Sequence, residues 1–126
     1  MNGLVITTDD RMYVQEFQDN IPLYKSVGTV VGGWIQIVSP KNLPCIYVLI
    51  CNEEGLLQRL PQNLTGCLMY DTITHGWPIV GNIVLMKHGT VNGEPDIIGL
   101  NDDDIKFLKD LVQAMTCDLV KTEASK

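Results

Sequence analysis

The sequence is short of positive charge and of aromatic side chains. Its 126 residues contain 9 lysines and arginines against 15 aspartates and glutamates, a net charge of −6, and only 6% are aromatic. No run of basic residues compensates locally, and phosphate backbones are bound mainly by such runs. The composition therefore argues against direct binding of DNA or RNA. It also predicts a mainly aliphatic core.

Long apolar runs of the kind found in membrane and exported proteins are missing too. No window approaches the roughly 18 apolar residues of a membrane span. The first twelve residues, MNGLVITTDDRM, do not place an apolar stretch after a basic one, as a signal peptide would. We therefore expect no membrane partner and a cytoplasmic location. There, the four cysteines, Cys45, Cys51, Cys67 and Cys117, are expected to be free thiols.

Closely spaced pairs of metal ligands are absent as well. The potential ligands Cys51, Cys67, His75 and His88 show no Cys-x-x-Cys or His-x-x-x-His spacing, with which one turn presents two zinc ligands. The three aspartates at 102–104 lack the spaced oxygens and the glycine of a calcium-binding loop. No glycine-rich phosphate loop or nucleophile elbow is present. The sequence thus predicts no metal, no cofactor and no identifiable catalytic residue.

A hydrophobic share of 45% and the periodicity of the chain predict the fold class. The length is that of one domain. We predict a single α+β domain over residues 1–117, with residues 118–126 as a frayed C-terminal tail. The sheet is predicted to be mostly antiparallel. One helix follows the first hairpin, and one C-terminal helix packs on the sheet.

The first half of the chain supplies a hairpin, a helix and two strands. GLVIT (3–7) and MYVQEF (12–17) are predicted to form the hairpin. Asn20 is predicted to cap the helix, which stops at Gly32-Gly33. WIQIV (34–38) alternates like a strand, and CIYVLIC (45–51) is apolar on both faces, as a central strand would be.

The second half is predicted to complete the sheet and to end in the most clearly marked helix. PIVGNIVLMKH (78–88) indicates a second central strand with a bulge at Gly81-Asn82. Asn92-Gly93 is a strong hairpin-turn signal. NDDDIKFLKDLVQAM (101–115) carries a capping residue, early acids that suit the helix dipole, and apolar residues at helical spacing.

The segment CNEEGLLQRLPQN (51–63) first suggests chemistry because two acids stand side by side. Asn-Glu-Glu-Gly (52–55) fits a type I turn with Gly55 in the left-handed conformation, and LLQRL (56–60) would return as a strand. Acids at the tip of such a hairpin stay solvated, which suits acid–base catalysis poorly. Pro61 ends that strand and should direct Asn63 toward a particular place.

The loop THGWPIVGN (74–82) is the better candidate for a binding site. It places the titratable ring of His75 beside the large side chain of Trp77, and loops often carry binding residues. The simpler alternative is that Trp77 only covers the core. We identify Asn63, His75, Trp77 and Asn82 as candidate ligand-binding residues.

Three segments together resemble a known family. They are VGGW (31–34), NEEG (52–55) and LPQN (60–63), followed by the acid-capped C-terminal helix. This order is similar to the pattern of the domain of unknown function 3846, a family of small proteins of bacteria, phages and mobile elements. TGCLMYDTITHGW (65–77) departs from that pattern. The resemblance implies a compact α+β accessory protein and brings no catalytic residues with it.

Three functions remain open at this point. The leading hypothesis is a non-enzymatic binding protein that engages a host protein or a small polar ligand. The alternative is a small hydrolase or transferase that uses His75 or a cysteine, which requires His75, Cys67 and Asn63 to converge. The third is a structural homo-oligomer that pairs through an edge strand or an apolar face.

Overall fold

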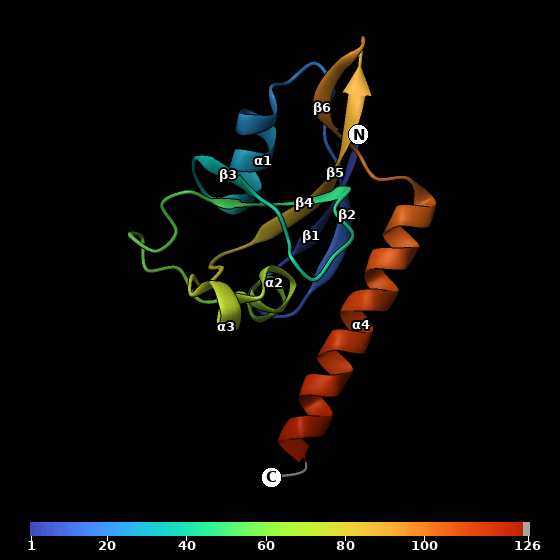
Figure 1. Cartoon of the computed structure of the whole chain (residues 1–126). Helices are drawn as coiled ribbons and strands as arrows, with labels where there is room; N and C mark the ends of the chain where they lie inside the picture. Colours follow the sequence, from blue (N-terminus) through green and yellow to red (C-terminus); the bar gives the residue numbers. More distant parts are fainter. Residues whose placement is uncertain (125–126) are drawn as a thin grey trace.

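The computed structural model describes residues 1–124, apart from the side chains of residue 75 and residues 116–124. Over that part of the chain, one antiparallel sheet has the strand order β2-β1-β5-β4-β3, with β6 paired to β5 (Figure 1). The predicted α+β class is confirmed. In chain order the elements are β1 (Asn2–Ile6), β2 (Met12–Glu16), α1 (Leu23–Val31), β3 (Ile35–Val38), β4 (Tyr47–Asn52), α2 (Leu64–Tyr70), α3 (Thr72–His75), β5 (Ile83–Val91), β6 (Glu94–Ile98) and α4 (Asp102–Ala124).

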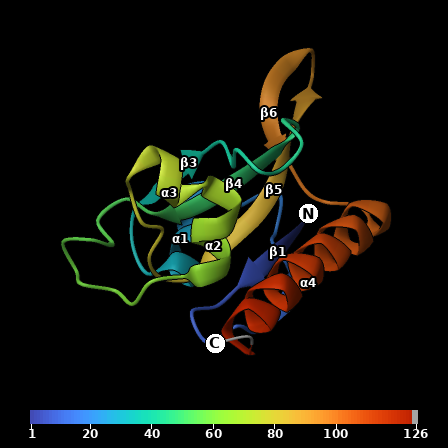
Figure 2. The same ribbon diagram turned by 60° about the horizontal axis from the view of Figure 1, so that its bottom comes forward.

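Helices cover both faces of the sheet. Successive residues of a strand point to opposite faces, so Val48 and Ile50 of β4 pack with α1, whereas Leu49 packs in the other apolar cluster. That second cluster also contains Met69 from α2 and Leu108 from α4. Figure 2 shows α4 running on the same side of the sheet as α2. All six residues of β4 are buried, as predicted for a central strand.

The local turn signals of the sequence are mostly confirmed. Asn92 and Gly93 both have positive φ, as the turn between β5 and β6 requires. Helix α1 ends at Gly32 in the left-handed conformation, with φ of 88°. Its start was predicted wrongly: Pro22 occupies the capping position, without a side-chain hydrogen bond, in place of Asn20. Proline is tolerated there because the first N–H groups of a helix have no partner within it.

The segment after β4 is not the predicted hairpin. Residues 53–59 form successive turns, and Gly55 is not among the glycines with positive φ. The Asn52 side chain turns the chain instead, because its Oδ1 accepts the Glu54 N–H at 2.8 Å. Glycine is needed at 55 for space: a Cβ there would lie 2.6 Å from Cγ2 of Val80. Figure 2 shows this loop reaching away from the sheet between β4 and α2.

The predicted interruption at Gly81-Asn82 is present, as a turn. Val80 forms an isolated bridge with Gln62, Gly81 has φ of 77°, and β5 begins only at Ile83. The chain between the bridge and the strand therefore bends instead of running through. Residues 77–80 therefore reach β5 through this bend.

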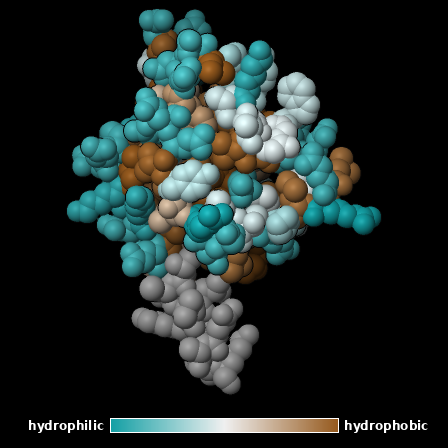
Figure 3. Space-filling view, turned by 180° about the vertical axis from the view of Figure 1, so that it is seen from behind, coloured by the Kyte–Doolittle hydropathy of each residue, from teal (hydrophilic) through white to brown (hydrophobic). Residues whose placement is uncertain are grey.

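Helix α4 carries the buried stripe that its periodicity predicts, with Leu108 and Val112 in the core. The predicted tail comprises residues 118–126. Its side chains lie outside the described part of the structure, and so does the backbone of residues 125–126. The domain end at 117 therefore stays a prediction. Among the described helices, none is long and apolar enough to cross a membrane. Hydrophobic side chains on the face shown in Figure 3 form patches separated by hydrophilic ones.

Candidate functional site

Asn63 is fully buried, and the fold uses every polar atom of its side chain. Its amide nitrogen donates to the carbonyl oxygens of Ile6 at 3.0 Å and Gly81 at 2.9 Å. Its Oδ1 accepts the N–H of Gly66 at 2.9 Å and so caps α2. The strand predicted before Pro61 is absent, since residues 53–59 form turns, and Asn63 lies in the interior. The geometry assigns Asn63 a structural role.

The other three predicted residues lie in different surroundings. Asn82 is half buried, and its side chain lies 3.5 Å from the carbonyl oxygen of Val30 at the end of α1. His75 ends α3, and its side chain lies outside the described residues. Trp77 is 66% exposed and lines a cavity to which Asn63 and Asn82 do not contribute. The predicted set therefore does not gather in that cavity.

Cys51 and Cys67 are held within the fold, whereas Cys45 is exposed. Cys67 is held by the backbone of Ile79, whose N–H and carbonyl oxygen lie 3.3 and 3.4 Å from the sulfur. Burial raises the pKa of Cys51 to about 11, which keeps it protonated at neutral pH. The described residues also contain no group of three His, Cys, Asp or Glu side chains that could hold a metal ion. Nothing in this geometry singles out a hydrolase or transferase centre.

One concave site is a cavity of about 490 Å³, which we call the edge cavity because it lies beside β3, at one edge of the sheet. Paired strands form one wall, since Gln36 of β3 lies opposite Cys51 of β4. The end of α2 and the segment before β5 form the other wall. Its lining residues are Gln36, Val38, Cys51, Asn52, Glu53, Leu56, Tyr70, Trp77, Pro78, Ile79 and Val80.

Local structure explains why the cavity opens here. Met69 of α2 is buried over the sheet, whereas Tyr70, the last residue of the helix, lines the cavity. The chain then turns at Asp71, whose φ of 65° ends α2, and the short α3 follows. It returns through Trp77 to the bridge at Val80. This detour separates the segment from the edge strand and leaves space between them.

Apolar side chains stand exposed around this end of the molecule. Leu57 is 84% exposed, and Leu56, which lines the cavity, is 49% exposed. A smaller neighbouring cavity of about 200 Å³ shares Pro78 with the edge cavity and is lined in part by Ile73, which is 96% exposed. Apolar groups gathered beside a cavity often mark a contact surface. Single exposed apolar residues elsewhere need no such explanation.

The charged groups of the two cavities have one sign. Glu53 lines the edge cavity and Asp71 lines its neighbour. No lysine or arginine appears among the described residues that line either one. β4 ends at Asn52, whose side-chain nitrogen donates to the carbonyl oxygen of Val31. Glu53 follows as an exposed residue, and its backbone N–H donates to the carbonyl oxygen of Trp34 at 2.8 Å. The acid that seemed to belong to a hairpin tip thus lines a cavity wall.

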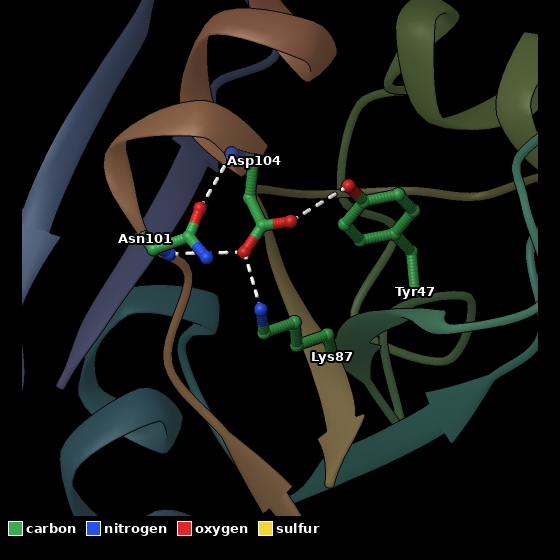
Figure 4. A network of polar contacts seen from close by, with 4 residues as sticks. All are labelled: Tyr47, Lys87, Asn101 and Asp104. Carbon is green, nitrogen blue, oxygen red and sulfur yellow. Dashed lines mark hydrogen bonds and ion pairs between the residues drawn. The ribbon is translucent and has the colours of Figure 1, made fainter.

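A second polar cluster lies at the start of α4 (Figure 4). Oδ1 of Asn101 accepts the N–H of Asp104 at 2.8 Å, and Oδ2 of Asp104 accepts the N–H of Asn101 at 3.0 Å. This is a reciprocal cap of the helix start. Asp104 also accepts the Tyr47 hydroxyl at 2.9 Å and pairs with Lys87 at 2.6 Å. The sequence predicted the cap but not its partners on β4 and β5.

The cluster perturbs the acid–base properties of its members. Burial alone would raise the pKa of Asp104. The hydrogen bonds from Lys87, Asn101 and Tyr47 outweigh that effect and hold the pKa below its ordinary value of 3.8. Burial, together with the bond to the Asp104 carboxylate, raises the pKa of Tyr47 to about 12. Perturbed groups can mark a functional site, but here each one has a partner within the fold. We interpret the cluster as the anchor of α4.

Comparison with known proteins gives one match. The family model of the domain of unknown function (DUF3846) matches residues 1–113. No curated protein and no solved structure matches the chain. The matched range includes the sheet, the edge cavity and the anchor of α4. The resemblance seen in the sequence is therefore confirmed over most of the chain.

Proposed function

The chain belongs to the DUF3846 family, and we propose that it is a non-enzymatic binding protein that engages a host protein through the edge cavity. The observation that supports this most is the cavity together with its exposed apolar surroundings. Trp77, which lines the space of about 490 Å³, is 66% exposed, and Leu57, the chain neighbour of the lining residue Leu56, is 84% exposed. Such side chains gain most when a partner covers them.

A protein partner suits this surface better than a small polar ligand alone. A small ligand inside the cavity would leave Leu57 and Ile73, both more than four-fifths exposed, in contact with water. A partner surface can bury them while one of its side chains enters the cavity, which is the usual arrangement of an interface anchor. The net charge of −6 disfavours a nucleic acid in that place.

The proposal includes a cellular setting. The protein would act in the cytoplasm of a bacterium that carries a phage or mobile element, as the family resemblance implies. The unpaired thiol of Cys45 supports a reducing compartment, because it is exposed and would be open to oxidation elsewhere. Self-association through the same apolar surface is the competing outcome, and the experiment below separates the two.

The test is a selection of random peptides against the full chain. Enriched peptides are titrated by calorimetry against the wild type, L57D and Q36W, in which a large ring fills the cavity. The matched control is V91D, which changes an exposed apolar residue on the β5–β6 hairpin. We expect at least tenfold weaker binding to L57D and to Q36W and an unchanged affinity for the control.

Two results would contradict the proposal. One is a selection that yields no binder, or only binders that L57D and Q36W leave unaffected. The other is a mass in solution, measured by light scattering, of a dimer that L57D converts to a monomer. In that case a second copy of the chain would cover the surface.

A further inference from the structure

The chemistry of the edge cavity also indicates which group of a partner it receives. We infer that the cavity binds a cationic side chain, an arginine or lysine of the partner, which ion-pairs with Glu53 and lies against Tyr70 and Trp77. This inference rests on the proposed function, because it names the occupant of the same cavity. It goes further by predicting the charge and shape of that occupant.

Charge is the first argument. Glu53 is the only charged residue among the described lining residues of the edge cavity. Asp71 is likewise the only charged residue among the described lining residues of the neighbouring cavity. A docked partner would remove water from Glu53, and a carboxylate without a counter-charge then costs free energy. A cation from the partner removes that cost and adds charge-assisted hydrogen bonds. An anionic side chain would meet repulsion instead.

The aromatic residues are the second argument. Tyr70 and Trp77 both line the cavity. A cation is attracted to the face of an aromatic ring, and the attraction grows as water is excluded. Two rings and a carboxylate around one space therefore favour an ammonium or guanidinium group over a neutral group of the same size.

The shape and the apolar walls are the third argument. Val38, Leu56 and Ile79 add apolar surface to the lining that Glu53 shares. Arginine and lysine have long aliphatic stems that pack on such surface while the charged end reaches a polar partner. A space of about 490 Å³ holds either side chain with room for a neighbouring residue.

The chain already pairs a carboxylate with a lysine internally, beside a tyrosine that contributes its hydroxyl group. At the start of α4, a carboxylate, a tyrosine and a lysine come together, with 2.6 Å between Lys87 and Asp104. The edge cavity repeats the carboxylate and the aromatic groups without a lysine or arginine among its described lining residues. The missing member is the one that we expect the partner to supply.

The experiment uses the full chain and two small probes. N-acetyl-arginine amide carries the cation, and N-acetyl-citrulline amide is its neutral counterpart of nearly equal shape. Trp77 reports binding by fluorescence in a W34F background, because Trp34 is the other tryptophan and stacks on Tyr24 away from the cavity. Amide shifts of Leu56 and Ile79 in ¹⁵N-edited NMR spectra give a second readout.

We expect the arginine probe to saturate both signals and the citrulline probe to bind at least tenfold more weakly. E53Q should weaken arginine binding about fivefold to tenfold, because a hydrogen bond to a charged group contributes more than one to a neutral group. The matched control is E54Q, which changes the adjacent acid, exposed like Glu53 but outside the cavity lining. It should change binding less than twofold.

Three outcomes overturn the inference. They are equal binding of the two probes, arginine binding that E53Q leaves unchanged, and no response to either probe in both readouts. Failure of the cation inference can be distinguished from failure of the proposed binding function. Selected peptides that need Leu57 but no basic residue would leave the binding function in place and remove the cation. A failure of both experiments would remove both.

Discussion

At the first turn of α4, the carboxylate of Asp104 meets Tyr47 and a lysine from the chain itself. At the edge cavity, Glu53 stands with Tyr70 and Trp77, and the described lining supplies no lysine or arginine. The Asp104 and Lys87 side chains are both only 14% exposed. Around the cavity, apolar and charged groups remain in contact with water.

The difference teaches how similar side chains can serve two purposes. Where a polar group finds all its partners within the fold, it fixes one element to another and offers nothing to a ligand. Where an acid and aromatic rings line a space that is open to solvent, a partner can add contacts to them. Asn63 belongs to the first kind, although its sequence context suggested the second. Variants in the two regions should therefore affect different properties.

The largest expected effect is at Asn63. N63A removes two hydrogen bonds to carbonyl oxygens and the cap of α2, and it leaves the buried groups of Ile6, Gly66 and Gly81 without their partner. We expect a loss of about 4 kcal/mol in the free energy of unfolding, since each buried unsatisfied group costs roughly 1–3 kcal/mol. Urea denaturation measures it.

The matched control for that prediction is N82A. Asn82 is half buried, and its contact to Val30 is long, at 3.5 Å. Loss of this contact in N82A should lower the free energy of unfolding by less than about 1 kcal/mol. If N63A and N82A lowered the free energy of unfolding by similar amounts, the hydrogen bonds of the buried Asn63 would be no more important for stability than the long contact of Asn82.

The next effect is at the anchor of α4. D104A removes the ion pair, half of the reciprocal cap and the partner of Tyr47, and it leaves Lys87 in a largely buried place. We expect a loss of about 3 kcal/mol, because most of the cost comes from the uncompensated charge. The double variant D104A/K87M should recover part of that loss.

A double-mutant cycle from urea denaturation tests the coupling between the two residues. Additive losses would show that Lys87 and Asp104 do not act as a pair, and the contrast with the edge cavity would disappear. The cycle needs no assumption about what each single variant does to the helix cap.

The pH dependence of stability should report on the same anchor. Because the folded pKa of Tyr47, about 12, lies above its ordinary value of 10, its contribution is full below pH 10 and is lost between pH 10 and 12. The loss should reach about 2 kcal/mol at the upper end. Because the pKa of Asp104 is lowered, its contribution is full above pH 4 and is lost as the pH falls below 3.8.

The free energy of unfolding, measured at a series of pH values, reports both the alkaline and the acid loss of stability. Y47F should flatten the alkaline decline relative to the wild type and leave most of the acid decline in place. An alkaline slope that is identical in the two proteins would show that the raised pKa of Tyr47 does not contribute to stability.

The sequence predicted the features that depend on neighbouring residues. The Asn92-Gly93 turn, the stop at Gly32 and the capped start of α4 are written in short segments, and all three are present. The edge cavity was not predictable in this way. Residues 53, 70 and 77, which are distant from one another in the sequence, line it together, so no local sequence pattern predicts it.

One wrong expectation and one unexpected placement have the same physical reason. The sequence predicts Gly55 as a turn glycine, whereas Val80, distant in sequence, is what excludes a side chain there. The sequence makes Asn63 a candidate ligand-binding residue, and the structure places it in the interior, against β1 and the turn before β5. One usable signal was overlooked: asparagine directly before the apolar segment 64–70 is typical of a helix cap.

The smallest expected effect on stability, and the sharpest on function, is at Leu57. It is 84% exposed, so L57D should change the free energy of unfolding by less than about 0.5 kcal/mol while it removes binding of selected peptides. L108A, at a fully buried leucine, should cost about 2–5 kcal/mol and serves as the control that large effects are measurable. If L57D destabilised the protein as L108A does, the loop would be part of the core in solution. The exposed apolar surface would then have no partner to explain, and the comparison between the two regions would fail.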